Sequence, residues 1–198
     1  KISLLNHNLD FAIQAIQKAI RLSGEPSYIF HYRLALLYWR TGRIEEANQE
    51  LQTALILEPN SAEAHIFQSE LHKVMKRPQA AMASLEKALR ILESQTEKRL
   101  QPVEQTEDQL WGFESPSLFS VHRLFVPLCL EAGELGLALY HAQSAMEYCP
   151  FSLEMGYWAA ALSRRLLQPE RFGRYADLID RYHSTGCFTS FTSDEEAE

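Results

Sequence analysis

Apolar residues recur every three or four positions through most of this chain, with polar residues between them. This spacing is typical of amphipathic helices that bury one face. Residues 40–65, RTGRIEEANQELQTALILEPNSAEAH, add small residues at Gly42, Ala47 and Ala54 and a proline at Pro59. The stretch therefore predicts a helix that ends near Gly42, a second helix, and a break at Pro59.

The same spacing returns in consecutive windows of about 34 residues, a period typical of helical repeat proteins. Windows 28–61 and 119–152 carry the full pattern, window 62–95 most of it, and window 153–186 part of it. Small residues occupy positions 8, 20 and 27, where two helices must approach closely. Positions 8, 20 and 27 hold Ala35, Ala47 and Ala54 in the first window, Ser69, Ala81 and Ala88 in the second, and Val126, Ala138 and Ala145 in the third. The fourth window has Ala160 at position 8 but the large Phe172 at position 20.

The pattern resembles the tetratricopeptide repeat, a helix–turn–helix unit of about 34 residues. The resemblance implies an all-α fold, a right-handed α-solenoid of antiparallel helix pairs with one concave and one convex wall. A single pair cannot bury its apolar face, whereas stacked neighbours can. Ala12, Ile16 and Ala19 have the spacing of a second helix whose first helix is truncated.

The period divides the chain into five segments. Residues 1–27 form a partial N-terminal repeat, 28–95 two repeats, 96–118 an irregular insertion, 119–186 two further repeats with the last one degenerate, and 187–198 an acidic tail that we expect to be mobile. We expect the insertion to prolong the preceding helix before it loops back. Because the chain begins within a helical pattern, we interpret it as a piece of a longer protein.

Glycine and capping residues predict where the helices turn. Gly42 and Gly133 can adopt the left-handed conformation that ends the first helix of a pair. Asn60 is the expected N-cap of the next helix, with Glu63 as its capping-box partner.

Composition restricts the function classes. The net charge of −7 and the pI near 5.5 argue against a dedicated nucleic-acid binder, which usually presents a basic face. The apolar runs are too short and too often interrupted by charge to span a membrane. Cys129, Cys149 and Cys187 have no CxxC spacing, which predicts reduced thiols and a cytoplasmic location. Cys129 falls at a core position, and Cys187 is the most reactive candidate.

No set of residues predicts an active site. His65 and His72 share a helix face but are separated by about 10 Å of helical rise, too far to hold one metal ion. His122 and His141 belong to the two helices of one pair and can meet, but no third ligand is spaced to complete a metal site. We find no phosphate-binding loop and no nucleophile or zinc motif. We therefore expect no catalytic, cofactor or metal site.

The resemblance places positions 2, 5, 9, 12 and 13 of each first helix on the concave groove. The lining is apolar and aromatic toward the N-terminus and more basic toward the C-terminus, which suits a protein or peptide partner with hydrophobic and acidic groups. An alternative is that Tyr32 and Trp39 are core residues beneath the partial first repeat. The candidate groove residues are Tyr32, Leu36, Trp39, Arg40, Ile66, Glu70, Lys73, Arg123, Arg164 and Arg165.

The chaperone-binding subset of this family holds a peptide carboxylate with lysine at position 5 and asparagine at position 9. Tyr32 and Leu36 stand there in the first window, so we do not expect a chaperone tail as ligand. Trp111 and Phe113 of the insertion either pack over the neighbouring repeats or contact a partner.

These features together predict a non-catalytic scaffold for protein–protein interaction. One alternative is a regulatory or substrate-recruiting domain of a larger enzyme. Another is helical-repeat RNA binding, against which the acidic charge counts. The exposed terminal repeats of such solenoids also allow a homodimer.

Overall fold

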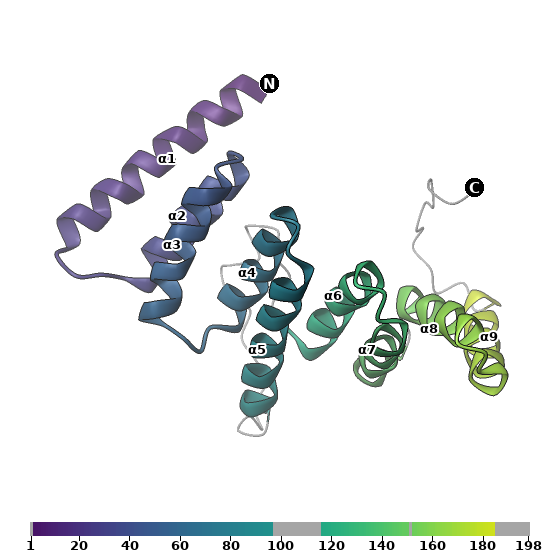
Figure 1. Cartoon of the computed structure of the whole chain (residues 1–198). Helices are drawn as coiled ribbons and strands as arrows, with labels where there is room; N and C mark the ends of the chain where they lie inside the picture. The colour runs from purple at the N-terminus through teal and green to yellow at the C-terminus, as the bar shows by residue number, and fades with distance from the viewer. Residues whose placement is uncertain (1, 97–115, 151, 185–198) are drawn as a thin grey trace. The chain divides into compact units, whose positions relative to one another are not determined.

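The structure, a computed structural model, describes residues 2–96, 116–150 and 152–184. These residues form nine α-helices, and none of them forms a β-strand (Figure 1). The helices are α1 (Ile2–Ser23), α2 (Tyr28–Arg40), α3 (Ile44–Leu57), α4 (Ala62–Val74), α5 (Pro78–Thr96), α6 (Leu118–Glu131), α7 (Leu135–Tyr148), α8 (Leu153–Arg165) and α9 (Pro169–Ser184).

The chain divides into two compact units, Lys1–Val121 and His122–Glu198. In the first unit each helix from α1 to α4 packs on the next one along the chain. In the second unit α7 packs on α8 and α8 on α9, while ring contacts join α6 to α7. The predicted helix pairs are therefore α2–α3, α4–α5, α6–α7 and α8–α9.

The small residues of the repeat are buried where the helices of a pair meet. Ala35, Ala47 and Ala54 are completely buried, and so are Ala138 and Ala145 of the third window. A larger side chain at these positions would push the two helices apart. The prediction that positions 8, 20 and 27 allow a close approach is confirmed for these windows.

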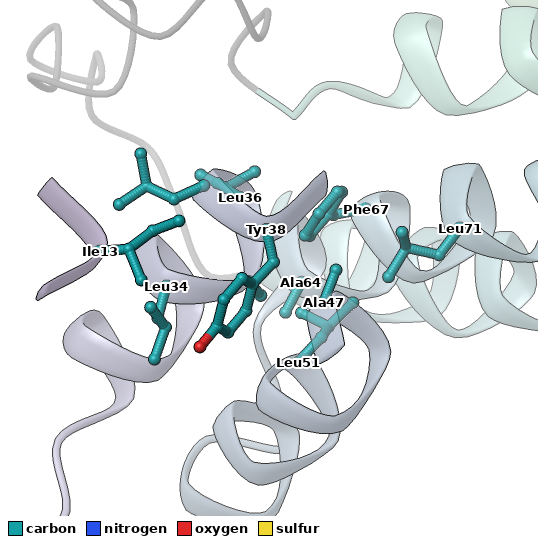
Figure 2. Packing of buried hydrophobic residues seen from close by; sticks show 11 residues of the cluster. Ile13, Leu34, Leu36, Tyr38, Ala47, Leu51, Ala64, Phe67 and Leu71 are labelled. Atoms are coloured by element: carbon teal, nitrogen blue, oxygen red, sulfur yellow. The ribbon is translucent and has the colours of Figure 1, made fainter. Parts of the chain in front are cut away.

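Larger apolar residues fill the space between the helices of the first unit. Figure 2 shows Leu34 and Tyr38 of α2, Leu51 of α3 and Phe67 of α4 gathered in one buried cluster, with Ile13 of α1 at its edge. The partial N-terminal repeat thus contributes to this core through α1.

The fourth window departs from the pattern in its second helix. Phe172 occupies position 20 of this window and is 37% exposed, while Ile179 at position 27 is buried. An aromatic ring does not fit where the repeat needs an alanine, so α9 packs on α8 with its own set of side chains.

The first helix of every pair ends in the same way. The N–H groups of Arg43, Arg77, Glu134 and Gln168 each donate to the carbonyl five residues earlier, at 2.8 to 2.9 Å. This bond is the hallmark of a Schellman turn, whose preceding residue takes a left-handed conformation. Gly42 and Gly133 hold that place with φ of +79°, as predicted.

Two non-glycine residues occupy the same left-handed place in the other pairs. Lys76 and Leu167 both have φ of +55°, a conformation that costs a side-chain-bearing residue roughly 1–2 kcal/mol. The turn geometry of the repeat therefore requires a strained backbone conformation in the second and fourth windows. In the first and third windows glycine adopts the same conformation without this free-energy cost.

Replacing Leu167 with glycine is expected to stabilise the second unit. Leu167 is 87% exposed, so the substitution removes the left-handed strain and gives up little packing. The free energy of unfolding should rise by about 0.5–1 kcal/mol after the extra flexibility of glycine in the unfolded chain is counted. Urea denaturation measures the change. The matched control is Leu166→Gly, at φ of −87°, which should destabilise; equal losses in both variants would contradict the account.

The predicted cap of α4 is wrong by one residue. Ser61, not Asn60, is the N-cap: its Oγ accepts a hydrogen bond from the N–H of Ala64 at 3.2 Å. Glu63 lies against the same hydroxyl, with its Oε2 3.2 Å from Ser61 Oγ, instead of reaching back to Asn60. Asn60 and Ser61 are both good N-caps, and the sequence pattern alone does not distinguish adjacent ones.

Some predictions fall on residues that the structure leaves out. Helix α5 continues to Thr96, one residue into the expected insertion. Trp111, Phe113, Cys187 and the acidic tail lie outside the described residues. Among the helices that are described, none is long and apolar enough to cross a membrane.

Candidate partner-binding surface

Helices α2 and α4 hold the aromatic part of the predicted surface. Tyr32 stacks on Tyr28 with ring centroids 5.5 Å apart, and it meets the edge of Phe67 of α4 at 6.1 Å. Trp39 meets Phe67 at 5.7 Å, also edge-on. Because Phe67 is buried and both partners are half-buried, these rings join successive helix pairs while keeping one side in solvent.

Leu36 does not belong to this surface. Its side chain is 5% exposed and is part of the same buried cluster as Ile13 of α1 and Leu34 (Figure 2). A side chain that its own chain covers cannot anchor a partner, so the assignment of Leu36 to the groove is corrected. Ile13 of α1 belongs to this buried cluster, and Leu9, Ala12 and Ile16 of the same helix pack against it.

Exposed apolar and charged side chains surround the aromatic part. Ile29 of α2 and Val74 of α4 are 53% and 54% exposed, Arg40 is exposed and Ile66 is half-buried. Two of the charges on α4 offset each other. Lys73 Nζ lies 3.1 Å from a carboxylate oxygen of Glu70, one helical turn away.

The second unit carries the basic part of the predicted surface. Arg123 of α6 lies 3.8 Å from the carboxylate of Glu154 at the start of α8, which places these two first helices side by side. Tyr157, Ala161 and Arg164 follow Glu154 at helical spacing, so they continue one line along α8. All three are exposed, Tyr157 by 50%.

The basic groups at the end of this line face solvent. Arg164 and Arg165 lie in the last turn of α8 and are both exposed. A positive side chain there interacts favourably with the partial negative charge at the carboxyl end of a helix. This region therefore offers guanidinium groups to an acidic ligand next to an aromatic ring.

A buried polar contact joins α6 to α7 in the same unit. The Nδ1 atoms of His122 and His141 are 2.8 Å apart, and both side chains are almost fully buried. The ring of His141 stacks on Phe125, with centroids 4.0 Å apart and an angle of 3° between the planes. Burial lowers the pKa of His141 to about 4, with a further contribution from the neighbouring charge of His122. Burial also lowers the pKa of His122, against the opposing effect of Glu147.

The two histidines do not form a metal site with a third ligand. No group of three or more histidine, cysteine or acidic side chains that could hold a metal ion occurs among the residues that the structure describes. Cys129 is completely buried, which raises the pKa of its thiol to about 11. The prediction that Cys129 is a small core residue is confirmed.

One contributor was not among the predicted groove positions. Tyr28 stacks on Tyr32, and the signal for this was an aromatic pair four residues apart on one helix. Glu154 was expected on the groove as position 2 of the fourth window, but its pairing with Arg123 was not predicted. The signal for that pair was the opposite charge of two groove positions in adjacent windows, which is weak without knowledge of which helix faces are adjacent.

Comparison with protein families identifies the repeat. A tetratricopeptide repeat family model matches residues 6–62 and again residues 32–95. The two matches overlap and together span residues 6–95. The resemblance inferred from the spacing is confirmed. A search of curated proteins gave no match.

Solved structures with the same fold cover most of the chain. MamA has a TM-score of 0.67 at 14% identity, over 90% of this chain and 91% of that one. YrrB, described as a TPR protein with an unusual peptide-binding site, has a TM-score of 0.63 at 17% identity, over 88% and 77%. PilF of Pseudomonas aeruginosa has a TM-score of 0.62 at 17% identity, over 90% and 71%. At these identities the likeness shows the fold, and it confirms the predicted class, an all-α solenoid of helix pairs.

Proposed function

We propose that this chain, which matches a tetratricopeptide repeat family model over residues 6–62 and 32–95, is a non-catalytic scaffold that binds a segment of a partner protein in the groove lined by its first helices. The observation that carries this proposal is the line of exposed residues on α8 beside Arg123. Tyr157, Ala161 and Arg164 present an aromatic ring and a guanidinium group on one helix face. Aromatic and arginine side chains are the usual binding hot spots of protein interfaces.

The charges of this region favour an acidic partner. Arg164 and Arg165 are exposed, and Arg123 already lies near a carboxylate of its own chain, that of Glu154. A carboxylate of the partner would take a similar position with respect to Arg123. The geometry of the internal ion pair thus indicates the chemistry of the external ligand.

The aromatic part on α2 and α4 would receive a hydrophobic anchor. Tyr32 and Trp39 are held by the buried ring of Phe67, so their orientation is fixed before a partner arrives. Fixed aromatic side chains lose little conformational entropy on binding. The description of YrrB as a peptide-binding protein of the same fold is consistent with a peptide-like ligand.

Reversing two charges of the basic part tests the proposal. The partner captured from the source lysate by the wild-type chain should be lost with Arg123→Glu/Arg164→Glu, which corresponds to at least about tenfold weaker binding. The matched control is Arg171→Glu/Arg174→Glu, the same charge change on exposed residues of α9. Equal loss in the control would indicate a general effect of net charge. Unchanged capture by the first variant would exclude the basic part of the groove.

Neutralising Glu154 should have the opposite effect. Glu154→Gln removes the internal carboxylate that competes for Arg123, so an acidic segment should bind up to about fivefold more tightly. Isothermal titration of that segment against both proteins measures the difference. Weaker binding to Glu154→Gln would mean that Glu154 itself contacts the partner, and it would contradict the proposed competition.

The remaining alternatives make separate predictions. A recruiting domain of a larger enzyme requires a catalytic motif elsewhere in the parent gene. RNA binding requires retention of RNA at low salt, which the net charge of −7 disfavours. If Trp111 and Phe113 form the contact instead, replacing both with alanine should abolish capture without changing stability. We also propose a cytoplasmic location, on the basis of the free thiols of Cys129 and Cys149.

A further inference from the structure

Histidine recurs at position 4 of the first helix in three of the four windows. His31, His65 and His122 occupy this position in α2, α4 and α6. In the fourth window the position is Gly156. The recurrence was not apparent from the small-residue pattern, because it involves a polar residue on a partly buried face.

Each of these histidines is connected to position 23 of the second helix in its pair. His31 Nδ1 lies 2.7 Å from Oε2 of Glu50 on α3. In the second pair the connection is indirect: His65 Nδ1 lies 3.4 Å from Oε1 of Gln68, which accepts a hydrogen bond from Ser84 of α5. In the third pair His122 Nδ1 lies 2.8 Å from Nδ1 of His141. We call these contacts the 4–23 pairs.

The third 4–23 pair differs because both of its side chains are imidazole rings. A hydrogen bond between two Nδ1 atoms needs one proton between them, so one ring must donate and the other must accept. One added proton can be accommodated, but a second would place two N–H groups and two positive charges against each other at 2.8 Å. Glu50, by contrast, can accept from the Nδ1–H of His31 whether the ring is neutral or charged.

The surroundings of the third pair offer little to stabilise two charges. Phe125 covers one face of His141, and Tyr148 stacks over His122 at 6.0 Å. The edge of Tyr140 approaches both rings, at 6.4 Å from His122 and 5.2 Å from His141. Buried rings with apolar neighbours cannot be solvated in place when they become charged.

Among the described residues, one carboxylate acts on this pair. Glu147 of α7 acts on His122 and favours its first protonation. On the other side, Arg123 of α6 is engaged with Glu154 of α8 at 3.8 Å. One nearby carboxylate can therefore offset one positive charge of the pair.

We propose that the His122–His141 pair is an acid-sensitive latch that holds α6 to α7 at neutral pH and releases them when both rings become protonated. Each of the other two 4–23 pairs contains a single imidazole, so protonation cannot place two charged rings against each other in them. Acid would thus open one defined helix pair, which carries Arg123 of the proposed partner surface, and leave α2–α5 folded.

Hydrogen exchange with mass spectrometry on the full chain tests this latch. Between pH 7.5 and pH 4.8, after correction for the intrinsic exchange rate, amides of α6 and α7 should lose protection at least about tenfold, while those of α2 and α3 keep theirs. Uniform loss over both units, or no loss in α6 and α7, would overturn the proposal.

Exchanging partners between the pairs gives the matched variants. His141→Glu gives His122 the same kind of partner that His31 has in Glu50, a carboxylate, and it should abolish the loss of amide protection in α6 and α7 at pH 4.8. His141→Asn replaces the second imidazole with a neutral group and should have the same effect. Glu50→His creates two facing bases in the first pair and should transfer the acid response to α2 and α3. An acid response that stays in α6 and α7 in the His141 variants would refute the latch.

A spectroscopic measurement on the unmodified chain covers the case in which a variant fails to fold. Long-range ¹H–¹⁵N NMR at pH 7.5 should show one of the two buried rings in the Nδ1–H form, as the contact requires. Finding both rings in the Nε2–H form would rule out the shared proton and the latch with it.

Discussion

Replacing Phe67 with alanine is expected to lower the free energy of unfolding of the first unit by about 3–5 kcal/mol. Phe67 is fully buried, and its ring contacts Tyr32 and Trp39 of the preceding helix pair. The substitution therefore removes the burial of one large ring and two edge-to-face contacts, and it leaves a cavity between α2 and α4. No other single change that we describe removes as much of the link between successive pairs.

Urea denaturation followed by far-UV circular dichroism measures this loss. The matched control is Phe172→Ala: this ring is 37% exposed on α9, so its removal should cost less than about 1.5 kcal/mol. If both substitutions cost the same, the packing of Phe67 between the pairs would not be the main source of stability in the first unit.

Lowering the pH from 7 to 4 is expected to destabilise the second unit by about 3 kcal/mol through His141 alone. An unfolded histidine has a pKa near 6.5, whereas burial lowers the pKa of His141 to about 4. Since the folded-state pKa is the lower one, the unfolded state binds more protons in this range. Stability is therefore complete above pH 6.5 and is lost as the pH falls toward 4. His122, whose pKa is also lowered, adds to the loss.

The fluorescence of Trp158 can follow this unit in a background in which Trp39 and Trp111 are replaced by phenylalanine. Urea unfolding at pH 7 and pH 4.5 gives the difference in the free energy of unfolding between the two pH values. This difference should be smaller by roughly 2–3 kcal/mol in His141→Asn. The matched control is His65→Asn in the first unit, which should leave the dependence in the second unit unchanged. If this difference in the free energy of unfolding is equal in the wild-type chain and in His141→Asn, carboxylates and not the buried histidine pair control acid unfolding.

The repeat was readable from the sequence because small residues have one physical role in it. Ala47 and Ala54 recur at fixed spacing since only small side chains allow the helices of a pair to touch, and both are completely buried. Gly42 and Gly133 marked turns that need a left-handed residue, and both adopt it. Such constraints involve only the two helices of one pair, so the residues that show them lie within a single 34-residue window of the sequence.

Features that depend on neighbouring elements were less predictable. Leu36 has the position of a groove residue in its window, but it lies in the buried cluster that also contains Ile13 of α1. Lys76 and Leu167 adopt the same left-handed conformation as the glycines without any compositional signal, because the shared turn geometry outweighs their local preference. The cap of α4 depended on a choice between two adjacent polar residues that propensity alone does not decide.

The polar 4–23 pairs show the same limit inside the core. The spacing of His122 and His141 predicts that they can meet, but it does not predict that they share a single hydrogen bond. Phe125 of α6 stacks on His141, and Tyr148 of α7 stacks on His122, so the contact lies among side chains of both helices. These positions must be compared across windows, in the structure, before their recurrence becomes visible.

The most direct test of the central proposal is the dissociation constant of the captured partner segment. Fluorescence anisotropy should be measured with the wild-type chain, with Arg123→Glu/Arg164→Glu, and with the control Arg171→Glu/Arg174→Glu. We predict at least about tenfold weaker binding to the first variant and an unchanged constant for the control. An unchanged constant for Arg123→Glu/Arg164→Glu would contradict the proposal that the first helices of the second unit receive the partner.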